Sequence, residues 1–394
     1  LLKGGRVDSV EPSKHDPATS YISVLRYQLG DWSPYVYRTK NYGKSWELIV
    51  EGIPDDFPVR VVREDPIKEG LLYAGTEFGI YISKDAGNNW IKFQKNLPVT
   101  PITDIKIQRD DIVLSTMGRS FWIMDDIQFL RYDIDSYKPE IVKPANAIRY
   151  RYSIPDIEIN DYLKPGIFID YYLDNSNYSN ILISFFDQNG MVVNTFSNKS
   201  DSLKLKKGYD MALNEFTSNN TAKVTIKRGY NRFRWDLRHK GIIENEKENN
   251  ILGPLVKPGK YKVQILLDNE NKIEEEIVIL KDPNSENTEN DFAKTERLQL
   301  KLLNKIREAN SIANELESSI SSKKLRKNKS SILKEKLNML ITKEGPYMQP
   351  MLIDQFKYLY NMVTRADQIL GNDAYYRFNT LSLELEKIKK SLKI

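Results

Sequence analysis

The sequence contains no cysteine and only two histidines, His15 and His239, among its 394 residues. Without cysteine the chain has no thiol nucleophile, no zinc–thiolate site and no disulfide, although this absence leaves the cellular compartment open. Two histidines are too few for a multi-histidine metal site. No apolar run approaches the roughly 20 residues needed to cross a bilayer. We therefore expect no metal, no cofactor and no transmembrane span.

The chain also has no strong excess of charge of either sign, because its 59 Lys and Arg are nearly balanced by 54 Asp and Glu. The net charge is +5. Spread over this length, that charge gives no indication of a nucleic-acid partner. The length is enough for two or three domains. The chain opens on LLKGGRVDSV, which is neither a methionine start nor a signal peptide and reads as a strand. We expect a piece of a longer protein.

A repeat is present near the N-terminus. The stretch YRTKNYGKSW at 37–46 matches YISKDAGNNW at 81–90 with an offset of 44 residues. The matched pairs are Thr39 with Ser83, Asn41 with Asp85, Gly43 with Gly87, and Trp46 with Trp90. A period of about 40–45 residues with four short alternating strands per unit is typical of a β-propeller blade.

Two full units and part of a third can be read from the alternation of apolar and polar residues. The third unit begins near Ile102 and lacks both the turn motif and an outer strand. We therefore predict that residues 1–142 form nearly three terminal blades. Propellers typically need four to eight blades to close a ring, so the missing blades are expected on another segment.

The acid at Asp85 is a catalytic group, a metal ligand or a turn residue. As a turn residue it accepts hydrogen bonds from the backbone N–H groups that follow it. Gly87 supplies the positive φ that the turn needs, and the ring of Trp90 packs between sheets. The copy with Asn41 favours the turn, since a turn tolerates asparagine and an acid catalyst does not.

These residues form the Asp box, S-x-D-x-G-x-x-W. Together with STMGRSFWIMDDI, GYNRFRWDLRHKG and GPLVKPGKYKVQILLD, the sequence resembles the bacterial, exported BNR-repeat proteins that are often labelled sortilin-like or glycosyl-hydrolase-like. The likeness runs from about Gly4 to Ser285 and is weaker beyond. It implies the C-terminal portion of a larger propeller protein, located in the periplasm, on the outer-membrane surface or outside the cell.

No catalytic constellation is recognisable in this chain. A glycosidase needs two carboxylates at a set separation, and the acids near the expected inner strands form no such pair by spacing. They are Asp8, Glu64, Asp65, Glu77, Asp104 and Asp125. Two equivalent inner strands are followed by Glu77 and by Arg119, and Trp122 lies in the strand that begins at Arg119. These three residues are the candidate ligand-binding rim. The alternative for Glu77 and Arg119 is an ion pair between blades.

Residues 143–285 keep a β pattern but lose the 44-residue period. Five to seven strands suggest an immunoglobulin- or fibronectin-like β-sandwich, with a type I′ turn at Asn189-Gly190. In NRFRWDL, Phe233, Trp235 and Leu237 share one face of a strand. The interleaved arginines are therefore a solvated face rather than a nucleic-acid site.

Residues 286–394 switch to helical periodicity, with apolar residues at three- and four-residue steps in four successive segments. Short links between amphipathic helices predict an antiparallel helical bundle. The fold class is therefore mainly β with an α tail.

Three functions remain open from the sequence. The first is a non-catalytic binding or assembly protein of the cell surface or periplasm, with the propeller as its binding face and the helical tail docked to a partner. The second is a glycosidase- or peptidase-like hydrolase whose catalytic residues lie in absent blades. The third is an accessory subunit of an outer-membrane complex. The partner is a protein, the missing propeller segment or a glycan.

Overall fold

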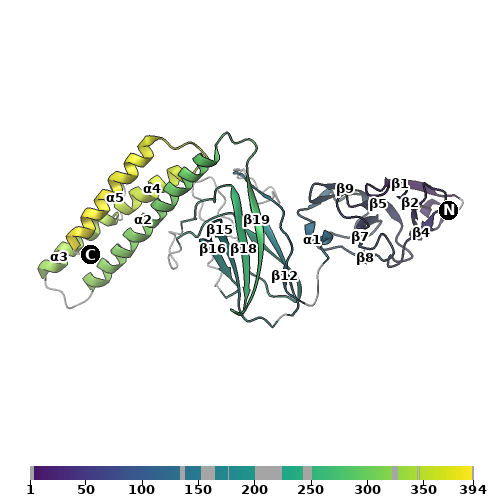
Figure 1. Cartoon of the computed structure of the whole chain (residues 1–394), viewed down its shortest axis with the longest axis horizontal. Coiled ribbons are helices and arrows are strands. Elements are labelled where there is room, and N and C mark those ends of the chain that lie inside the picture. The colour runs from purple at the N-terminus through teal and green to yellow at the C-terminus, as the bar shows by residue number, and fades with distance from the viewer. Residues whose placement is uncertain are drawn as a thin grey trace. The chain divides into compact units, whose positions relative to one another are not determined.

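The computed structural model describes residues 4–133, 138–151, 165–175, 177–199, 224–242, 251–321, 327–343, 345 and 347–392. The chain divides into two compact units, residues 1–135 and 136–394, which we describe separately. Figure 1 shows the elements in chain order: strands fill the first unit and the start of the second, and helices end the chain. The protein is thus mainly β with a helical C-terminal region.

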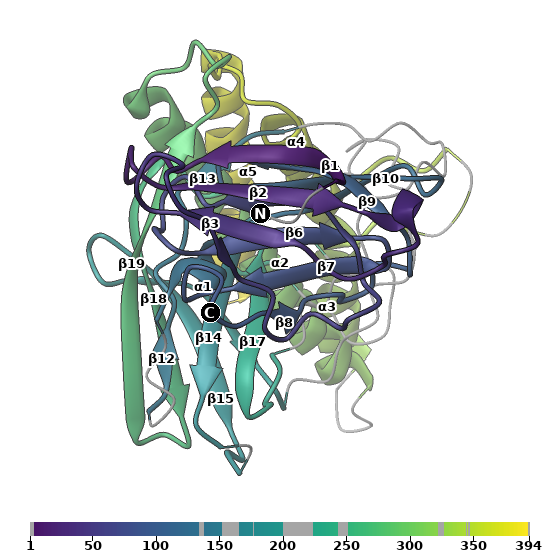
Figure 2. The same ribbon diagram turned by 90° about the vertical axis from the view of Figure 1, so that its right-hand side faces the viewer.

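The first unit holds three small antiparallel sheets that follow one another along the chain. Sheet 1 contains β1 (Arg6–Pro12), β2 (Ser20–Leu25), β3 (Val36–Thr39) and β4 (Glu47–Leu48). Sheet 2 contains β5 (Val59–Glu64), β6 (Leu72–Thr76), β7 (Gly79–Ser83) and β8 (Ile91–Lys92). Sheet 3 contains β9 (Ile102–Gln108), β10 (Asp111–Thr116) and β11 (Phe121–Met124). Figure 2 shows β1, β2 and β3 running side by side.

Buried hydroxyl groups join sheet 1 to sheet 2. The side-chain oxygens of Ser9 and Ser23 lie 2.8 Å apart. The Ser23 hydroxyl also donates to the Arg60 carbonyl at 2.7 Å, and the Ser9 oxygen accepts from the Val62 N–H at 3.1 Å. Because buried polar groups are costly without partners, these bonds fix the register of one sheet against the next.

Sheets 2 and 3 approach each other closely at Gly75. A Cβ atom at this position would lie 2.7 Å from Val61 Cγ1 and 2.8 Å from Ile102 Cγ2. No real side chain fits at those distances without displacing β9. The glycine is therefore what lets β6 of sheet 2 sit against sheet 3.

Short helical turns complete the first unit. η1 (Tyr27–Leu29) lies between β2 and β3, and α1 (Gln128–Arg131) follows β11. Arg131 of α1 donates to both oxygens of the fully buried Asp65 at 2.9 and 3.0 Å. This pair holds α1 against sheet 2.

The second unit opens with two sheets that share one hydrophobic core. The smaller has the order β12-β14-β17 and the larger the order β13-β19-β18-β15-β16, with β13 and β19 parallel. The strands are β12 (Glu140–Ile141), β13 (Ala147–Arg149), β14 (Ile167–Leu173), β15 (Ile181–Asp187), β16 (Val192–Ser197), β17 (Gly229–Trp235), β18 (Gly259–Leu267) and β19 (Asn271–Lys281). Since β12 pairs with β14, it belongs to this unit. The contact boundary after residue 135 thus precedes the predicted one at 142.

The apolar face predicted for NRFRWDL is confirmed, but its arginines are half-buried rather than solvated. Phe233, Trp235 and Leu237 are buried, and the Trp235 ring stacks on Phe185 with centroids 4.0 Å apart. On the other face, Arg232 pairs with Asp170 at 2.7 Å. Its charge is neutralised within the fold, which supports a structural role.

The β15–β16 hairpin corrects one prediction. A type I′ turn needs positive φ at both central residues, but only Gly190 has it, at 77°, while Asn189 does not. The Gly190 N–H donates to the Asp187 carbonyl at 3.0 Å, and the Asp187 carboxylate accepts from the N–H groups of Asn189 and Met191 at 2.9 Å. The loop is therefore a three-residue connection closed by a left-handed glycine.

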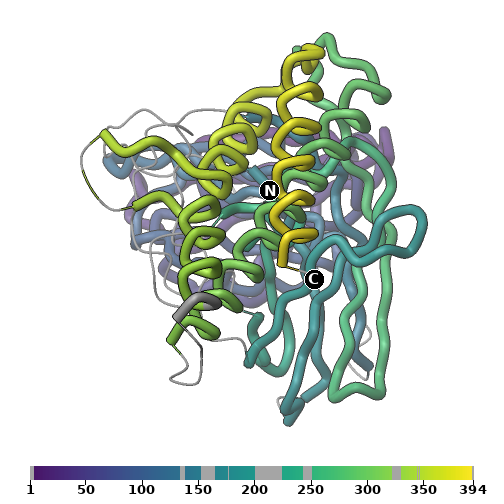
Figure 3. Tube along the Cα trace, turned by 90° about the vertical axis from the view of Figure 1, so that its left-hand side faces the viewer, coloured from purple at the N-terminus to yellow at the C-terminus, as the bar shows by residue number. Residues whose placement is uncertain are grey.

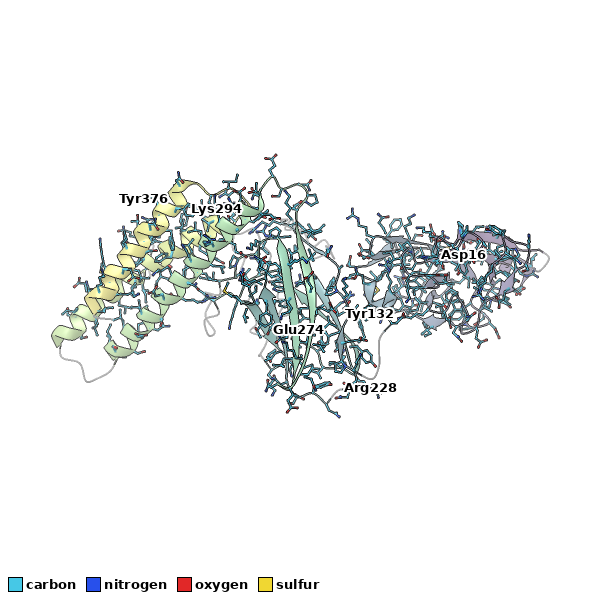
Figure 4. The ribbon with its side chains drawn as sticks, viewed as in Figure 1. Asp16, Tyr132, Arg228, Glu274, Lys294 and Tyr376 are labelled. Carbon is cyan, nitrogen blue, oxygen red and sulfur yellow. The ribbon has the colours of Figure 1, made fainter. Side chains whose placement is uncertain are left out.

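Helices follow the two sheets: α2 (Glu289–Ser321), α3 (Lys327–Leu340), α4 (Leu352–Thr364) and α5 (Asn372–Leu392). They bury one shared core, and Figure 3 shows α4 and α5 running beside α2. Figure 4 shows Tyr376 on the outer side of α5, where it is 75% exposed. His239 joins the sheets to α2, because its Nε2 lies 2.9 Å from Glu296 Oε1.

Candidate functional site

The Asp-box corner between β7 and β8 is closed by its own side chains. Asp85 Oδ1 accepts from the Asn89 N–H at 2.9 Å and from the Ser83 hydroxyl at 2.7 Å. The Ser83 oxygen in turn accepts from the Gly87 N–H at 2.8 Å. Burial raises the pKa of Asp85, but the hydrogen bonds from Asn89 and Ser83 outweigh this effect and hold it below its ordinary value. An acid with that pKa cannot serve as a proton donor near neutral pH.

The copy of the motif in sheet 1 repeats this geometry with an amide. Asn41 Oδ1 accepts from the Ser45 N–H at 2.9 Å and from the Thr39 hydroxyl at 3.1 Å. Thr39 Oγ1 accepts from the Gly43 N–H at 3.0 Å. Because a neutral amide makes the same backbone bonds as the carboxylate, the arrangement needs an acceptor rather than a charge.

We expect Asp85→Asn to lower the free energy of unfolding of the first unit by less than about 0.5 kcal/mol, because the amide keeps the acceptor. Asp85→Ala should lower it by about 1–2 kcal/mol, because the Asn89 and Ser83 bonds are lost. Urea unfolding, monitored by hydrogen exchange of the β7 amides, measures the loss of stability in both variants. Equal losses for the two variants would contradict a role as a turn acceptor.

The two tryptophans of the motif differ in their surroundings. Trp90 is 3% exposed, and its indole N–H donates to the Ile49 carbonyl of the sheet 1 segment at 2.9 Å. Arg38 of β3 reaches in the opposite direction and donates to the Ala86 carbonyl at 2.7 Å. Trp46 is only half-buried, because no sheet precedes sheet 1 among the described residues.

The candidate rim residues do not form one cluster. Glu77 pairs with Arg60 of its own sheet at 2.5 Å, and the Arg60 guanidinium lies 6.0 Å from the ring centroid of Tyr27. Arg119 is exposed in the β10–β11 turn, where its carbonyl accepts from the Trp122 indole N–H at 2.9 Å. The structure therefore brings Arg119 and Trp122 together and gives Glu77 a different partner.

The β2–β3 loop is a feature that the sequence patterns did not single out. Asp31 accepts from the Arg26 Nε and from the Tyr35 hydroxyl, each at 2.8 Å, and these bonds hold the pKa of Asp31 well below its ordinary value. They fix a loop that carries Trp32, which is 50% exposed and 6.0 Å from the Tyr27 ring. The aromatic content of RYQLGDW was the available signal.

The acids near the strand ends have partners. Arg6 pairs with Asp8 at 2.5 Å, Arg63 with Asp104 at 2.7 Å, and Arg131 with Asp65 at 2.9 Å. Glu64 accepts from the Tyr21 hydroxyl at 3.4 Å, and Asp125 also has a partner. No two of these carboxylates are left facing one another as a free pair in the described part of the chain.

No group of three or more His, Asp or Glu suited to a metal ion occurs among the described residues. His15 Nε2 instead lies 2.8 Å from the Asp65 carbonyl. Within the same residues, no helix combines the length and the apolar character needed to span a membrane.

No family model matches this sequence, and no curated protein matches it either. Among solved structures, YCF48 bound to a D1 peptide is 14% identical, with a TM-score of 0.25 over 44% of this chain and 52% of that one. The Niastella koreensis GH74 enzyme is 10% identical, with a TM-score of 0.26 over 30% and 21%. The Xanthomonas campestris GH74 xyloglucanase is 11% identical, with a TM-score of 0.23 over 68% and 38%. The chain thus spans about half or less of each, and likeness at this level favours neither binding nor hydrolysis.

Proposed function

We propose that this chain is a non-catalytic binding and assembly protein of the bacterial cell surface or periplasm. Sheets 1, 2 and 3 are the terminal blades of an Asp-box propeller of the BNR, sortilin-like type. The strands of 143–285 form an immunoglobulin- or fibronectin-like sandwich, and 286–394 form an antiparallel bundle. The stacked sheets with equivalent Asp-box corners support the first assignment.

The observation that carries the non-catalytic role is the pairing of the acids at the strand ends. Asp8, Glu77, Asp104 and Asp65 each form an ion pair with an arginine. An arginine within ion-pair distance accounts for each of these carboxylates as a structural group of the fold. A hydrolase would need two carboxylates facing one substrate.

The outer face of sheet 1 supports assembly with a further propeller segment. Tyr37 occupies the place that Tyr81 has in sheet 2, and Tyr81 packs in the core between sheets 1 and 2. The outer face also carries exposed Val10 and Leu48. By the repeat, this face is built to receive another sheet, so a further propeller segment is one expected partner.

The helical tail offers a second docking surface. α5 carries Tyr376 and Leu383 seven residues apart, and both are exposed large hydrophobics. Residues at that spacing lie on one side of a helix. Exposed apolar side chains on one stripe are typical of a protein-interaction surface.

The experiment compares capture with turnover. The tagged chain should retain one envelope protein of its source bacterium at fixed stoichiometry, with the reciprocal capture also seen. Leu383→Glu should reduce that capture at least tenfold, while Lys301→Glu, an exposed control on α2, should not. Polysaccharide or peptide hydrolysis that Glu77→Gln abolishes would establish the hydrolase instead.

A further inference from the structure

Sheet 3 has one strand fewer than sheets 1 and 2 in the described residues. Its inner turn matches that of sheet 2, because Thr76 Oγ1 donates to the Gly79 carbonyl at 3.0 Å and Thr116 Oγ1 to the Ser120 carbonyl at 2.6 Å. Phe121 is therefore the equivalent of Ile80, the residue after that turn.

The equivalent carbonyl receives a fourth strand in both complete sheets. In sheet 1 the Val36 carbonyl accepts from the Ile49 N–H at 2.9 Å, just beyond β4. In sheet 2 the Ile80 carbonyl accepts from the Phe93 N–H at 2.9 Å, just beyond β8. In the described part of sheet 3, no backbone N–H takes this place at Phe121. Among the residues that the structure describes, the outer edge of β11 is therefore unpaired.

The side chains of β11 are open as well. Phe121 is 75% and Ile123 61% exposed. Ile80 and Ile82, at the equivalent positions of β7, are buried because their face of sheet 2 packs against sheet 3 at Gly75 and Ile102. An uncovered strand edge flanked by apolar side chains is a template for pairing with another chain.

A side chain of α1 already packs against the residue that follows β8 in sheet 2. Phe129 of α1 is buried, and its ring centroid lies 6.5 Å from that of Phe93. Phe93 is the equivalent of Ile49 in the preceding repeat. The Ile49 carbonyl accepts a hydrogen bond from the Trp90 indole N–H. An added strand would therefore need only to pair with the edge of β11, beside Phe121 and Ile123.

We propose that the edge of β11 binds an extended segment of a protein partner as the fourth strand of sheet 3. The segment runs antiparallel to β11, donates a backbone N–H to the Phe121 carbonyl, and places an apolar side chain beside Phe121. This mode of recognition takes its affinity from main-chain hydrogen bonds and its specificity from alternate side chains. The inference deepens the proposed binding function and rests on it.

A partner is favoured over a second copy of this chain. The strands that fit such an edge, β4 and β8, are already paired with β3 and β7 in their own sheets. A second copy would have to break one of those pairings to supply the strand. A partner segment that is extended and unpaired before binding has no such cost.

The test uses a labelled peptide, KSWELIVEG, which repeats residues 44–52 of the chain. Fluorescence anisotropy with the whole protein should show saturable binding. Methylating the backbone nitrogen of the isoleucine, the position of Ile49, should weaken binding about tenfold or more, because the bond to Phe121 is lost. Methylating the preceding leucine nitrogen should change binding less than about twofold, because alternate N–H groups of an antiparallel strand point away from the partner.

Two controls locate the site. Ile123→Glu should weaken binding at least about fivefold, because the new carboxylate would lie beside the glutamate of the peptide, as Arg38 lies beside Glu47 in sheet 1. Ile67→Glu, which changes an exposed apolar residue of the β5–β6 loop, should not weaken it. A photoreactive leucine in the peptide should cross-link near Trp122. Cross-links at Tyr37, which β4 already faces, would instead show exchange with sheet 1 and overturn the proposal.

The outcomes also separate this inference from the proposed function. If the whole protein captures its partner but the peptide fails to bind, or the two methylated peptides bind equally, the β11 site is wrong and the binding function stands. If the peptide binds β11 as expected but no envelope protein is captured, the edge is confirmed and the proposed cellular role fails.

Discussion

Trp90→Ala is expected to lower the free energy of unfolding of the first unit by about 3–5 kcal/mol, the range for removing a large buried aromatic side chain. The ring is buried between sheets 1 and 2, and truncation leaves a cavity on both sides of that interface. The change also leaves the Ile49 carbonyl without the indole N–H that lies 2.9 Å away. Because the indole contacts both sheets, we expect a loss of stability in sheet 1 as well as in sheet 2.

Trp46→Ala is the matched control, since it alters the same motif position one repeat earlier. Its half-buried ring should cost only about 1 kcal/mol on truncation, because less apolar area is buried. Hydrogen exchange in β3 and β6 reports the first unit, and the helices of the second unit serve as an internal reference. Similar losses for both variants would show that Trp90 does not hold the sheets together.

Much of the first unit could be predicted because its information is local. The 44-residue offset aligns side chains that close their own turns, such as Asp85 with Asn89 and Asn41 with Ser45. Strand alternation likewise places Phe233 and Trp235 in the core. Such contacts span four residues or follow a fixed period, so a single sequence contains the evidence for them.

Contacts between sheets could not be predicted in this way. Arg38 of sheet 1 bonds the Ala86 carbonyl, 48 residues away, and Arg63 of sheet 2 pairs with Asp104 of sheet 3. Charge and spacing alone allow several partners for each arginine, and only the stacking of the sheets selects one. The predicted type of the Asn189-Gly190 turn was wrong for a local reason, since the Asp187 carboxylate accepts from the N–H groups of Asn189 and Met191.

In the second unit, a buried arginine joins the sheets to the helices. Arg149 at the end of β13 is 3% exposed. It donates from Nε to the Val256 carbonyl at 2.7 Å and from Nη2 to Asp367 Oδ1 at 2.8 Å. Its guanidinium also lies 4.8 Å from the ring centroid of Phe292 in α2. This one side chain therefore joins a strand, a loop and two parts of the helical region.

Arg149→Met should lower the free energy of unfolding of the second unit by about 3–5 kcal/mol, because breaking a buried ion pair leaves a carboxylate without its main partner. Adding Asp367→Leu should restore part of the loss, since the stranded charge is removed. Circular dichroism at 222 nm during urea unfolding follows the helices of this unit. If the double variant is no more stable than Arg149→Met, the pair is not what joins helices to sheets.

The same pair predicts a dependence on pH. Burial raises the pKa of Asp367, but the hydrogen bond and charge of Arg149 and the charge of Arg151 outweigh it, so the pKa lies below its ordinary value. A carboxylate with a lowered pKa stabilises the fold above its unfolded pKa of about 3.9 and loses that contribution as the pH falls further. Asp367→Asn should therefore be clearly less stable than the wild type at pH 7. The gap should narrow below about pH 4, and a gap that stays constant down to pH 2 would show that the ionised form of Asp367 adds nothing.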